Sequence, residues 1–351
     1  MKLLIGLLTA LALTLLAALG ARGQSAPTTA PAPWQLSNGG KSLQVKAKCT
    51  TAELDAVCKA HSGDLTTILF DWSNESIDSF APLAQVKGLK TLHMMSLKAS
   101  QKQPLDLAPL AGLTDLEDLD LYGTHVKNTA ALAGLKKIKS LSFYMSNVDA
   151  IDCVASMENL ETLSLYGFEH TFKDYRPLVG LKKLKDLNVY MNKQATDPLL
   201  APLAALASLE SIHMANDSSI TTLAFLKGSK GMKTISANWC RGLKDISALE
   251  GMDQIEALEL DDTPISDIGV LAGKAHLRTL AIPGTKVTDL TPLAKCGELQ
   301  MLNIAKTPVK DLSPLTACTK LTQLQVPDTV PQDQIDALKK ALPKLRVEVQ
   351  K

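Results

Sequence analysis

Apolar residues recur at fixed offsets along most of this chain. The segments LTDLEDLDLYGTHVKNTAALAG, from Leu113, and CGELQMLNIAKTPVKDLSPLTA, from Cys296, show the pattern, and the commonest step between copies is 22 residues, as from Leu277 to Leu299. Each copy contains an apolar pair separated by one residue, so it predicts a short strand with both side chains on one face. The first residues of these pairs are Leu119, Leu141, Leu163, Leu187, Ile212, Ile235, Leu258, Leu280, Leu302 and Leu324.

One such strand cannot bury its leucines alone, but strands stacked about 4.8 Å apart form a parallel sheet with a continuous apolar interior. The returning half of each copy reads like VTDLTPL, and we interpret Thr291-Pro292 and Ser313-Pro314 as an N-cap followed by proline at the first helical position. The pattern therefore predicts an α/β solenoid with a parallel β-sheet on the concave face and short helical or 3-10 turns on the convex face.

These copies resemble the leucine-rich repeat family, particularly the bacterial 22-residue class of internalin-like proteins, whose fold is a horseshoe. The resemblance covers residues 62–329, about twelve turns including degenerate copies around Ile68 and Leu92. It implies an internal polar ladder whose side chains satisfy backbone groups at the turns. In this chain that column holds Thr124, Ser146, Asn192, Cys240, Thr263, Thr285, Thr307 and Thr329.

Both ends of the solenoid need caps, because the core and the sheet edge are otherwise exposed. Residues 41–61 predict a strand followed by an amphipathic helix as the N-terminal cap. Residues 330–351 predict a C-terminal cap, with a helix from Pro331 to Leu342 and an alternating edge strand after it.

The N-terminus has the pattern of a secretory signal. Lys2 is followed by the apolar LLIGLLTALALTLLAALG and then by small residues, so we expect a signal peptide over residues 1–23, with cleavage after Gly23 or after Gly20. An uncleaved anchor is the alternative. Residues 24–40 are rich in Pro, Ala, Thr and Gly and predict a flexible linker. With no LPxTG wall-anchor motif, we expect an exported periplasmic or secreted protein with no stable membrane insertion after cleavage.

Six cysteines in an exported chain suggest disulfides. Cys49 and Cys58 are the best candidate pair, because they lie together in the predicted N-terminal cap; two buried thiols are the alternative. Cys296 and Cys318 share a column on adjacent turns, and the sequence leaves open whether they are bonded.

Composition and motifs favour a binding protein over an enzyme. The chain has 37 Lys and Arg against 36 Asp and Glu, so it lacks a single-sign charge that would attract nucleic acid. It contains no HExxH, GxSxG or CxxC motif, and we expect no metal, no cofactor and no catalytic residues. Asp261 and Asp262 are interpreted as a solvated turn.

Tyrosines occupy one outward strand position on four consecutive turns, just after the buried pair. Tyrosine flanked by small polar residues is typical of recognition surfaces. The predicted ligand-binding residues on the concave face are Tyr122, Tyr144, Tyr166, Tyr190, His93, Asp118, Asp120, Asp186 and Asn188.

A structural role is the main alternative for these tyrosines, because neighbouring rings stabilise a sheet by stacking across strands. The segments from Ala133 and from Val179 are close copies, so the four positions are not independent. The favoured function is a monomeric, exported, non-catalytic module that binds a protein or peptide partner and no nucleic acid. The alternatives are a structural envelope component without a specific ligand and, least favoured, a secreted hydrolase.

Overall fold

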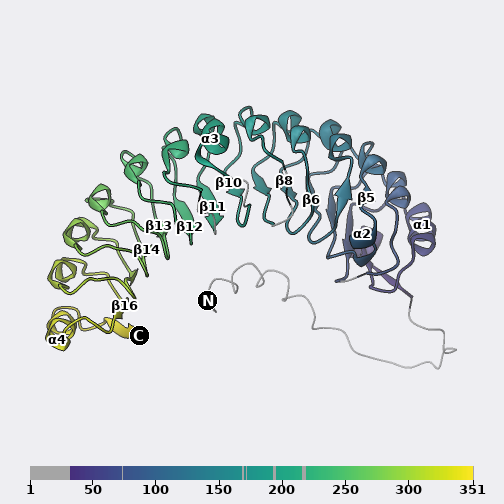
Figure 1. Cartoon of the computed structure of the whole chain (residues 1–351). Helices are drawn as coiled ribbons and strands as arrows, with labels where there is room; N and C mark the ends of the chain where they lie inside the picture. Colours follow the sequence, from purple (N-terminus) through teal and green to yellow (C-terminus); the bar gives the residue numbers. More distant parts are fainter. Residues whose placement is uncertain are drawn as a thin grey trace, which may run out of the picture. The chain divides into compact units, whose positions relative to one another are not determined.

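The computed structural model describes residues 32–72, 74–167, 170, 172–192, 195–215 and 219–350. Residues 33–350 form a curved solenoid, with strands along the inner side of the arc and short helical turns along the outer side (Figure 1). The predicted signal peptide and residues 24–31 of the predicted linker lie outside the described residues. In the part of the chain that the structure describes, no helix has the length and hydropathy needed to cross a membrane.

The predicted parallel sheet is confirmed. The described strands form a main sheet of 15 strands in sequence order, antiparallel at the first pair and parallel from β2 to β17. Its strands are β1 (Trp34–Ser37), β2 (Ser42–Val45), β3 (Thr67–Phe70), β4 (Thr91–His93), β6 (Asp118–Asp120), β8 (Ser140–Ser142), β9 (Thr162–Ser164), β10 (Asp186–Asn188), β11 (Ser211–Ala215), β12 (Thr234–Asn238), β13 (Ala257–Glu259), β14 (Thr279–Ala281), β15 (Met301–Asn303), β16 (Gln323–Pro327) and β17 (Arg346–Gln350). A second, two-stranded sheet pairs β5 (Leu105–Asp106) with β7 (Val126–Lys127).

The returning halves form short helices on the convex side, as predicted. Most are 3-10 turns: η2 (Ala81–Gln85), η3 (Ala108–Leu110), η4 (Thr129–Gly134), η5 (Asp152–Ser156), η6 (Arg176–Leu178), η7 (Ala201–Ala205), η8 (Ala224–Leu226), η9 (Ser247–Leu249), η10 (Gly269–Leu271), η11 (Thr291–Lys295) and η12 (Ser313–Ala317). A further 3-10 turn, η1 (Asn38–Gly40), joins the antiparallel strands β1 and β2. The α-helices are α1 (Thr51–Ala60), α2 (Lys98–Lys102), α3 (Asp197–Leu200) and α4 (Gln332–Ala341).

The predicted N-caps at Thr291 and Ser313 are wrong by one residue. The N-caps are Leu290 and Leu312, whose side chains make no capping bond. The aspartate before each N-cap residue provides the capping hydrogen bond instead: the Asp289 carboxylate accepts from Thr291 N at 2.8 Å. Asp106, Asp174, Asp245, Asp267 and Asp311 accept from the backbone N–H two residues later in the same way.

The apolar column residues form one continuous core. Leu119, Leu141 and Leu258 are fully buried, and the cluster runs from Leu43 to Leu345. Each strand is too short to enclose a core by itself, so the buried side chains of neighbouring turns cover one another.

The internal polar ladder is confirmed except at its last position. The hydroxyls of Thr263, Thr285 and Thr307 each donate to the backbone carbonyl three residues earlier, at 2.7–2.8 Å. Ser146 Oγ reaches back one turn and donates to Leu121 O at 2.7 Å. Thr329 is exposed, because the turn after β16 leads into the C-terminal cap and has no repeat beyond it to cover it.

Strand β1 differs from the prediction. Residues 24–40 were predicted as linker, whereas Trp34–Ser37 pair antiparallel with β2 and Trp34 packs against the core. The strand extends the N-terminal cap outward by one element. The sequence did not predict this strand, because the prolines before it indicated a linker over the whole of residues 24–40.

The predicted Cys49–Cys58 disulfide is absent, and all six cysteines are buried and outside disulfides. Cys58 lies on the buried face of α1, and Cys49 Sγ donates to Thr50 O at 3.6 Å. Burial raises the pKa of Cys49 to about 11 and that of Cys58 to about 12. Cys296 and Cys318 are also free, and each thiol donates to a carbonyl of the preceding turn, Leu271 O and Leu293 O, at 3.3 Å.

Candidate functional site

The predicted tyrosines lie together at the end of four neighbouring strands. Each follows a buried third apolar residue, and Tyr122, Tyr144 and Tyr190 occupy the second position of a tight turn. In the first such turn, Thr124 N donates to Leu121 O at 2.9 Å, and Gly123 takes a φ of 59°. Met145 and Met191 take the same left-handed conformation, at 55° and 63°, so the turn geometry holds the tyrosine before each of them toward the concave face.

The four rings form one continuous stack. The ring centroids of Tyr122 and Tyr144 are 4.7 Å apart, those of Tyr144 and Tyr166 are 4.1 Å apart, and those of Tyr166 and Tyr190 are 5.0 Å apart. The interplanar angles are 9°, 1° and 12°, so the faces of the inner rings cover each other.

A fifth ring, missing from the sequence prediction, extends the stack. Trp72 lies 5.2 Å from Tyr122, centroid to centroid, at a tilt of 51°, and 54% of Trp72 is exposed. We call Trp72, Tyr122, Tyr144, Tyr166 and Tyr190 the aromatic ladder. In the β3 repeat, the column that holds the tyrosines contains Asp71. The ring at this end of the ladder therefore comes from the next residue, Trp72, which the turn after β3 places against Tyr122.

The ladder is partly supported from within. The Tyr166 hydroxyl donates to Met191 Sδ at 3.2 Å. Burial raises the pKa of Tyr122, Tyr144 and Tyr190, with Tyr166 the next cause in each case. The four tyrosines are half-buried, so each is packed against its neighbours and also partly accessible to solvent.

The other predicted site residues lie at the two ends of the tyrosine row. At the β4–β6 end, His93 Nε2 is 2.8 Å from Asp118 Oδ2. Burial lowers the pKa of His93, but the hydrogen bond and charge of Asp118, with the charge of Asp120, outweigh it and the net pKa is raised. Asp120 Oδ1 accepts from Tyr122 N at 3.1 Å, and burial raises the pKa of Asp120.

At the β10 end, Asn188 Oδ1 accepts from Tyr190 N at 2.9 Å. Asp186 Oδ2 lies 3.7 Å from Nε2 of His213, a residue outside the predicted set. Asp120 and Asn188 therefore fix the backbone of the tyrosine turns as well as facing the concave side.

A second polar group lies further along the concave face, at β12 and β13. Asn238 Nδ2 donates to Glu259 Oε2 at 3.3 Å, and Trp239 Nε1 donates to Asp262 Oδ2 at 3.1 Å. Asp261 Oδ1 is buried without a hydrogen-bond partner. Burial, with the charges of Glu259 and Asp262, raises the pKa of Asp261 to about 6. Asp261 is thus half-buried, which differs from the predicted solvated turn.

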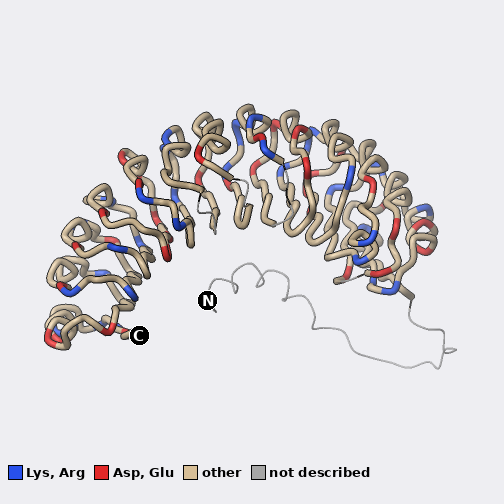
Figure 2. Tube along the Cα trace, in the orientation of Figure 1, with Lys and Arg blue, Asp and Glu red and all other residues tan. Residues whose placement is uncertain are grey.

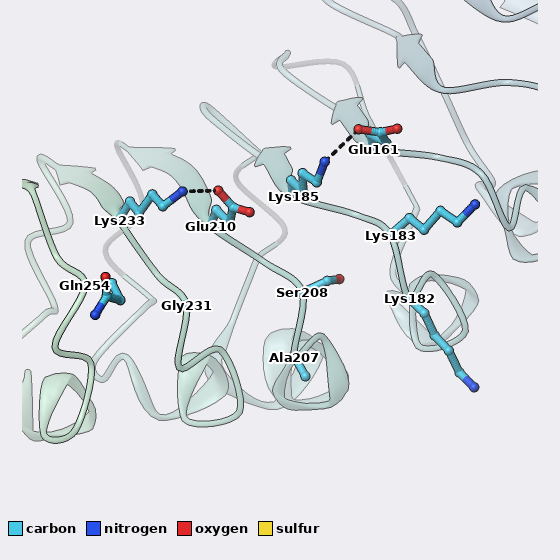
Figure 3. Close-up of a pocket in the computed structure, with 10 residues that line it drawn as sticks. All are labelled: Glu161, Lys182, Lys183, Lys185, Ala207, Ser208, Glu210, Gly231, Lys233 and Gln254. Atoms are coloured by element: carbon cyan, nitrogen blue, oxygen red, sulfur yellow. Dashed lines mark hydrogen bonds and ion pairs between the residues drawn. The ribbon is translucent and has the colours of Figure 1, made fainter.

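Charged side chains form a ladder along one rim of the sheet. Its residues alternate in sign from turn to turn: Lys90, Glu117, Lys139, Glu161, Lys185, Glu210, Lys233, Glu256 and Arg278. Lys139 Nζ lies 2.6 Å from Glu117 Oε2, for example. Lys185 pairs with Glu161 at 2.9 Å and Lys233 with Glu210 at 2.6 Å around a hollow of about 430 Å³ (Figure 3). Lys182 and Lys183 also line this hollow, and Lys183 Nζ donates to the neutral Asn159 Oδ1 at 2.7 Å.

Metal-ligating side chains do not cluster in the described residues. No group of three or more His, Cys, Asp or Glu side chains among them is placed to hold a metal ion. The concave face presents the aromatic ladder, with carboxylates at the β6 end and at the β10 end of the tyrosine row.

Comparisons with known proteins agree on the fold. No family model matches the sequence, and no curated protein matches it. An internalin (inlF) from Listeria monocytogenes is 21% identical, with a TM-score of 0.68 over 86% of this chain and 85% of the other. A leucine-rich repeat protein from Leptospira interrogans is 14% identical, with a TM-score of 0.57 over 88% of both chains.

A third similar structure is the TLR13–ssRNA13 complex, 15% identical with a TM-score of 0.61, in which 88% of this chain covers 50% of the other. The repeated strands, the convex 3-10 turns and these likenesses lead to one conclusion. The chain has the leucine-rich-repeat solenoid fold, which it shares with the internalin and the Leptospira protein.

Proposed function

We propose that this chain is an exported, non-catalytic binding module whose concave face captures a protein or peptide partner. The aromatic ladder carries the proposal: five rings lie in one row beside carboxylates and small polar side chains, such as Asp120 and Asn188. Large, rigid rings with polar tips give contact area at low conformational cost. The apolar start of the sequence supports export, and solenoids of this fold present extended concave surfaces to partners.

A structural role of the ladder is the second candidate. The close, nearly parallel stacking of Tyr144 and Tyr166 favours it, because stacked rings stabilise neighbouring strands without any ligand. In that case the chain is an envelope component whose concave face has no specific partner.

Paired substitutions separate the two functions. Tyr144→Ala with Tyr166→Ala is expected to abolish capture of a partner cross-linked from envelope extract, because aromatic anchors often contribute about 2 kcal/mol or more each. The double Tyr→Phe variant keeps the ring area and removes both hydroxyls, so it reports the polar contribution alone. Val179→Ala, an exposed change beside convex η6, is the control and leaves capture unchanged.

A structural ladder gives the opposite result. The Ala double variant then lowers the melting temperature clearly, while both double variants capture the same proteins as the unmodified chain. Capture that survives both double variants excludes the tyrosines as the binding site.

A further inference from the structure

Charge is unevenly divided between the concave face and the rest of the solenoid. From β3 to β16, the three inward-facing strand columns contain no Lys or Arg. The same columns hold six carboxylates: Asp71, Asp118, Asp120, Asp186, Glu259 and Asp261. The whole chain has a net charge of +1, so its positive charge lies elsewhere, on the rims, turns and caps (Figure 2).

Among the described residues, none of these carboxylates forms an ion pair with Lys or Arg. In the described residues, their ion-pair partners are histidines alone, His93 for Asp118 and His213 for Asp186. The rim carboxylates are different, because Lys or Arg faces each of Glu117, Glu161, Glu210 and Glu256. The acidic character of the concave face is therefore available to a ligand.

The exposed end of the aromatic ladder fits the same chemistry. Trp72 is 54% exposed and directly follows Asp71, whereas the inner tyrosine faces are covered by stacking. An indole face is the best aromatic surface for a Lys or Arg cation, and a neighbouring carboxylate adds to the attraction.

Resting on the function proposed above, we propose that the partner presents a basic, Lys- or Arg-rich segment. The segment lies across the strands from Trp72 to Asp261, with one cation on Trp72 and others on the concave carboxylates. The eight strand steps from β3 to β13 span about 38 Å, which about eleven extended residues cover. A nucleic acid is disfavoured as the partner, because its phosphates would meet carboxylates that have no Lys or Arg partner on this face.

A fluorescent peptide of alternating Arg and Ser, about twelve residues long, is the direct probe. Its binding to the full-length chain is measured by anisotropy at low and at high salt. We expect binding that weakens at least about tenfold as salt screens the concave carboxylates. A peptide of alternating Glu and Ser and an oligouridylate of matched length are expected not to bind.

Two triple variants with equal loss of charge locate the site. Asp120→Asn, Asp186→Asn and Glu259→Gln remove concave carboxylates, and we expect affinity for the Arg peptide to fall about tenfold. Asp64→Asn, Glu158→Gln and Glu250→Gln remove exposed carboxylates outside the three inward columns, and we expect a change within about twofold. Circular dichroism melts confirm that both variants fold.

Equal weakening by both triple variants overturns the inference, as does equal or tighter binding of the Glu peptide or the oligouridylate. These failures are distinct from failure of the proposed function. If the Tyr144 and Tyr166 variants lose the captured partner while the concave triple variant keeps it, the face binds a partner whose basic charge is not the determinant.

Discussion

At the scale of single residues, burial gives several side chains properties unlike those of their exposed counterparts. Asp261 follows Leu260, which is fully buried just after β13, and Asp261 Oδ1 has no hydrogen-bond partner. The neighbouring Glu259 and Asp262 add like charge. An ionised Asp261 is therefore costly to the folded state.

The stability of the protein is expected to depend on the charge of Asp261. Its pKa is raised from 3.8 to about 6, so the folded state loses stability as pH rises through this window and the loss persists at pH 7. Asp261→Asn is expected to raise the free energy of unfolding at pH 7 by about 1 kcal/mol, a value that allows for partial solvent screening, and to make little difference near pH 4. Urea unfolding of both proteins at pH 7 and near pH 4 measures this difference in the free energy of unfolding.

Asp262→Asn is the matched control. Asp262 is exposed and its side chain already accepts a hydrogen bond from Trp239, which an amide oxygen can replace. Equal stabilisation by both variants at pH 7 contradicts the role assigned to Asp261 and indicates general charge repulsion in this turn.

The cysteines give a second prediction at this scale. Burial raises the pKa of Cys49 to about 11 and of Cys58 to about 12, so thiolate is scarce in the folded protein. We expect iodoacetamide at pH 8 to leave both residues unmodified until denaturant is added, as read by peptide mass mapping. Rapid modification of folded protein, or a Cys49–Cys58 linked peptide, contradicts the buried free thiols.

At the scale of single elements, turn geometry decides where each strand ends and how closely turns approach. Left-handed residues such as Met145 and Lys306 end the strands. Gly228, after η8, has a different role: a Cβ at this residue would lie 2.0 Å from Ala204 O of the preceding turn. The close approach of two backbones requires glycine there.

Gly228→Ala is expected to destabilise the protein by roughly 1–3 kcal/mol, because the clash is with backbone and one turn must shift. Gly231→Ala is the control three residues away, where a Cβ meets nothing within 4 Å. We expect that variant to melt at or slightly above the temperature of the unmodified chain. Similar melting temperatures for the two variants contradict the close packing of η7 against η8.

At the scale of the whole molecule, stability depends on contacts between neighbouring turns and on caps at both ends. The N-terminal cap has a helix, α1, whose N-terminus is closed by a capping box between Thr50 and Glu53. The C-terminal cap covers the last repeat with α4 and adds β17 to the sheet edge. Ile335 and Leu338 of α4 are buried against the core.

Removing the C-terminal cap, residues 331–351, is expected to leave a chain that aggregates. The deletion exposes the apolar side chains of the last turn and the edge of β16 together. Size-exclusion chromatography and light scattering measure the change. A truncated chain that remains monomeric with an unchanged melting temperature contradicts the assignment of these residues as a cap.

The sequence by itself determined the repeat, the parallel sheet, the buried columns and the tyrosine row, because a repeat makes burial a local, periodic property. Leu119 and Tyr122 are assigned to opposite sides by spacing alone, and the structure agrees. Both cap helices also followed from amphipathic spacing.

Only the tertiary structure decided features that depend on distances between turns. Trp72 joins the ladder because it reaches Tyr122 across the intervening turn, which column alignment does not show. Asp261 is half-buried between neighbouring turns and its Oδ1 has no hydrogen-bond partner. Cys49 and Cys58 remain separate thiols although they are near in sequence. The periodicity of the sequence predicts which face of the sheet a residue occupies. The residues that it contacts depend on how adjacent turns are placed in the tertiary structure.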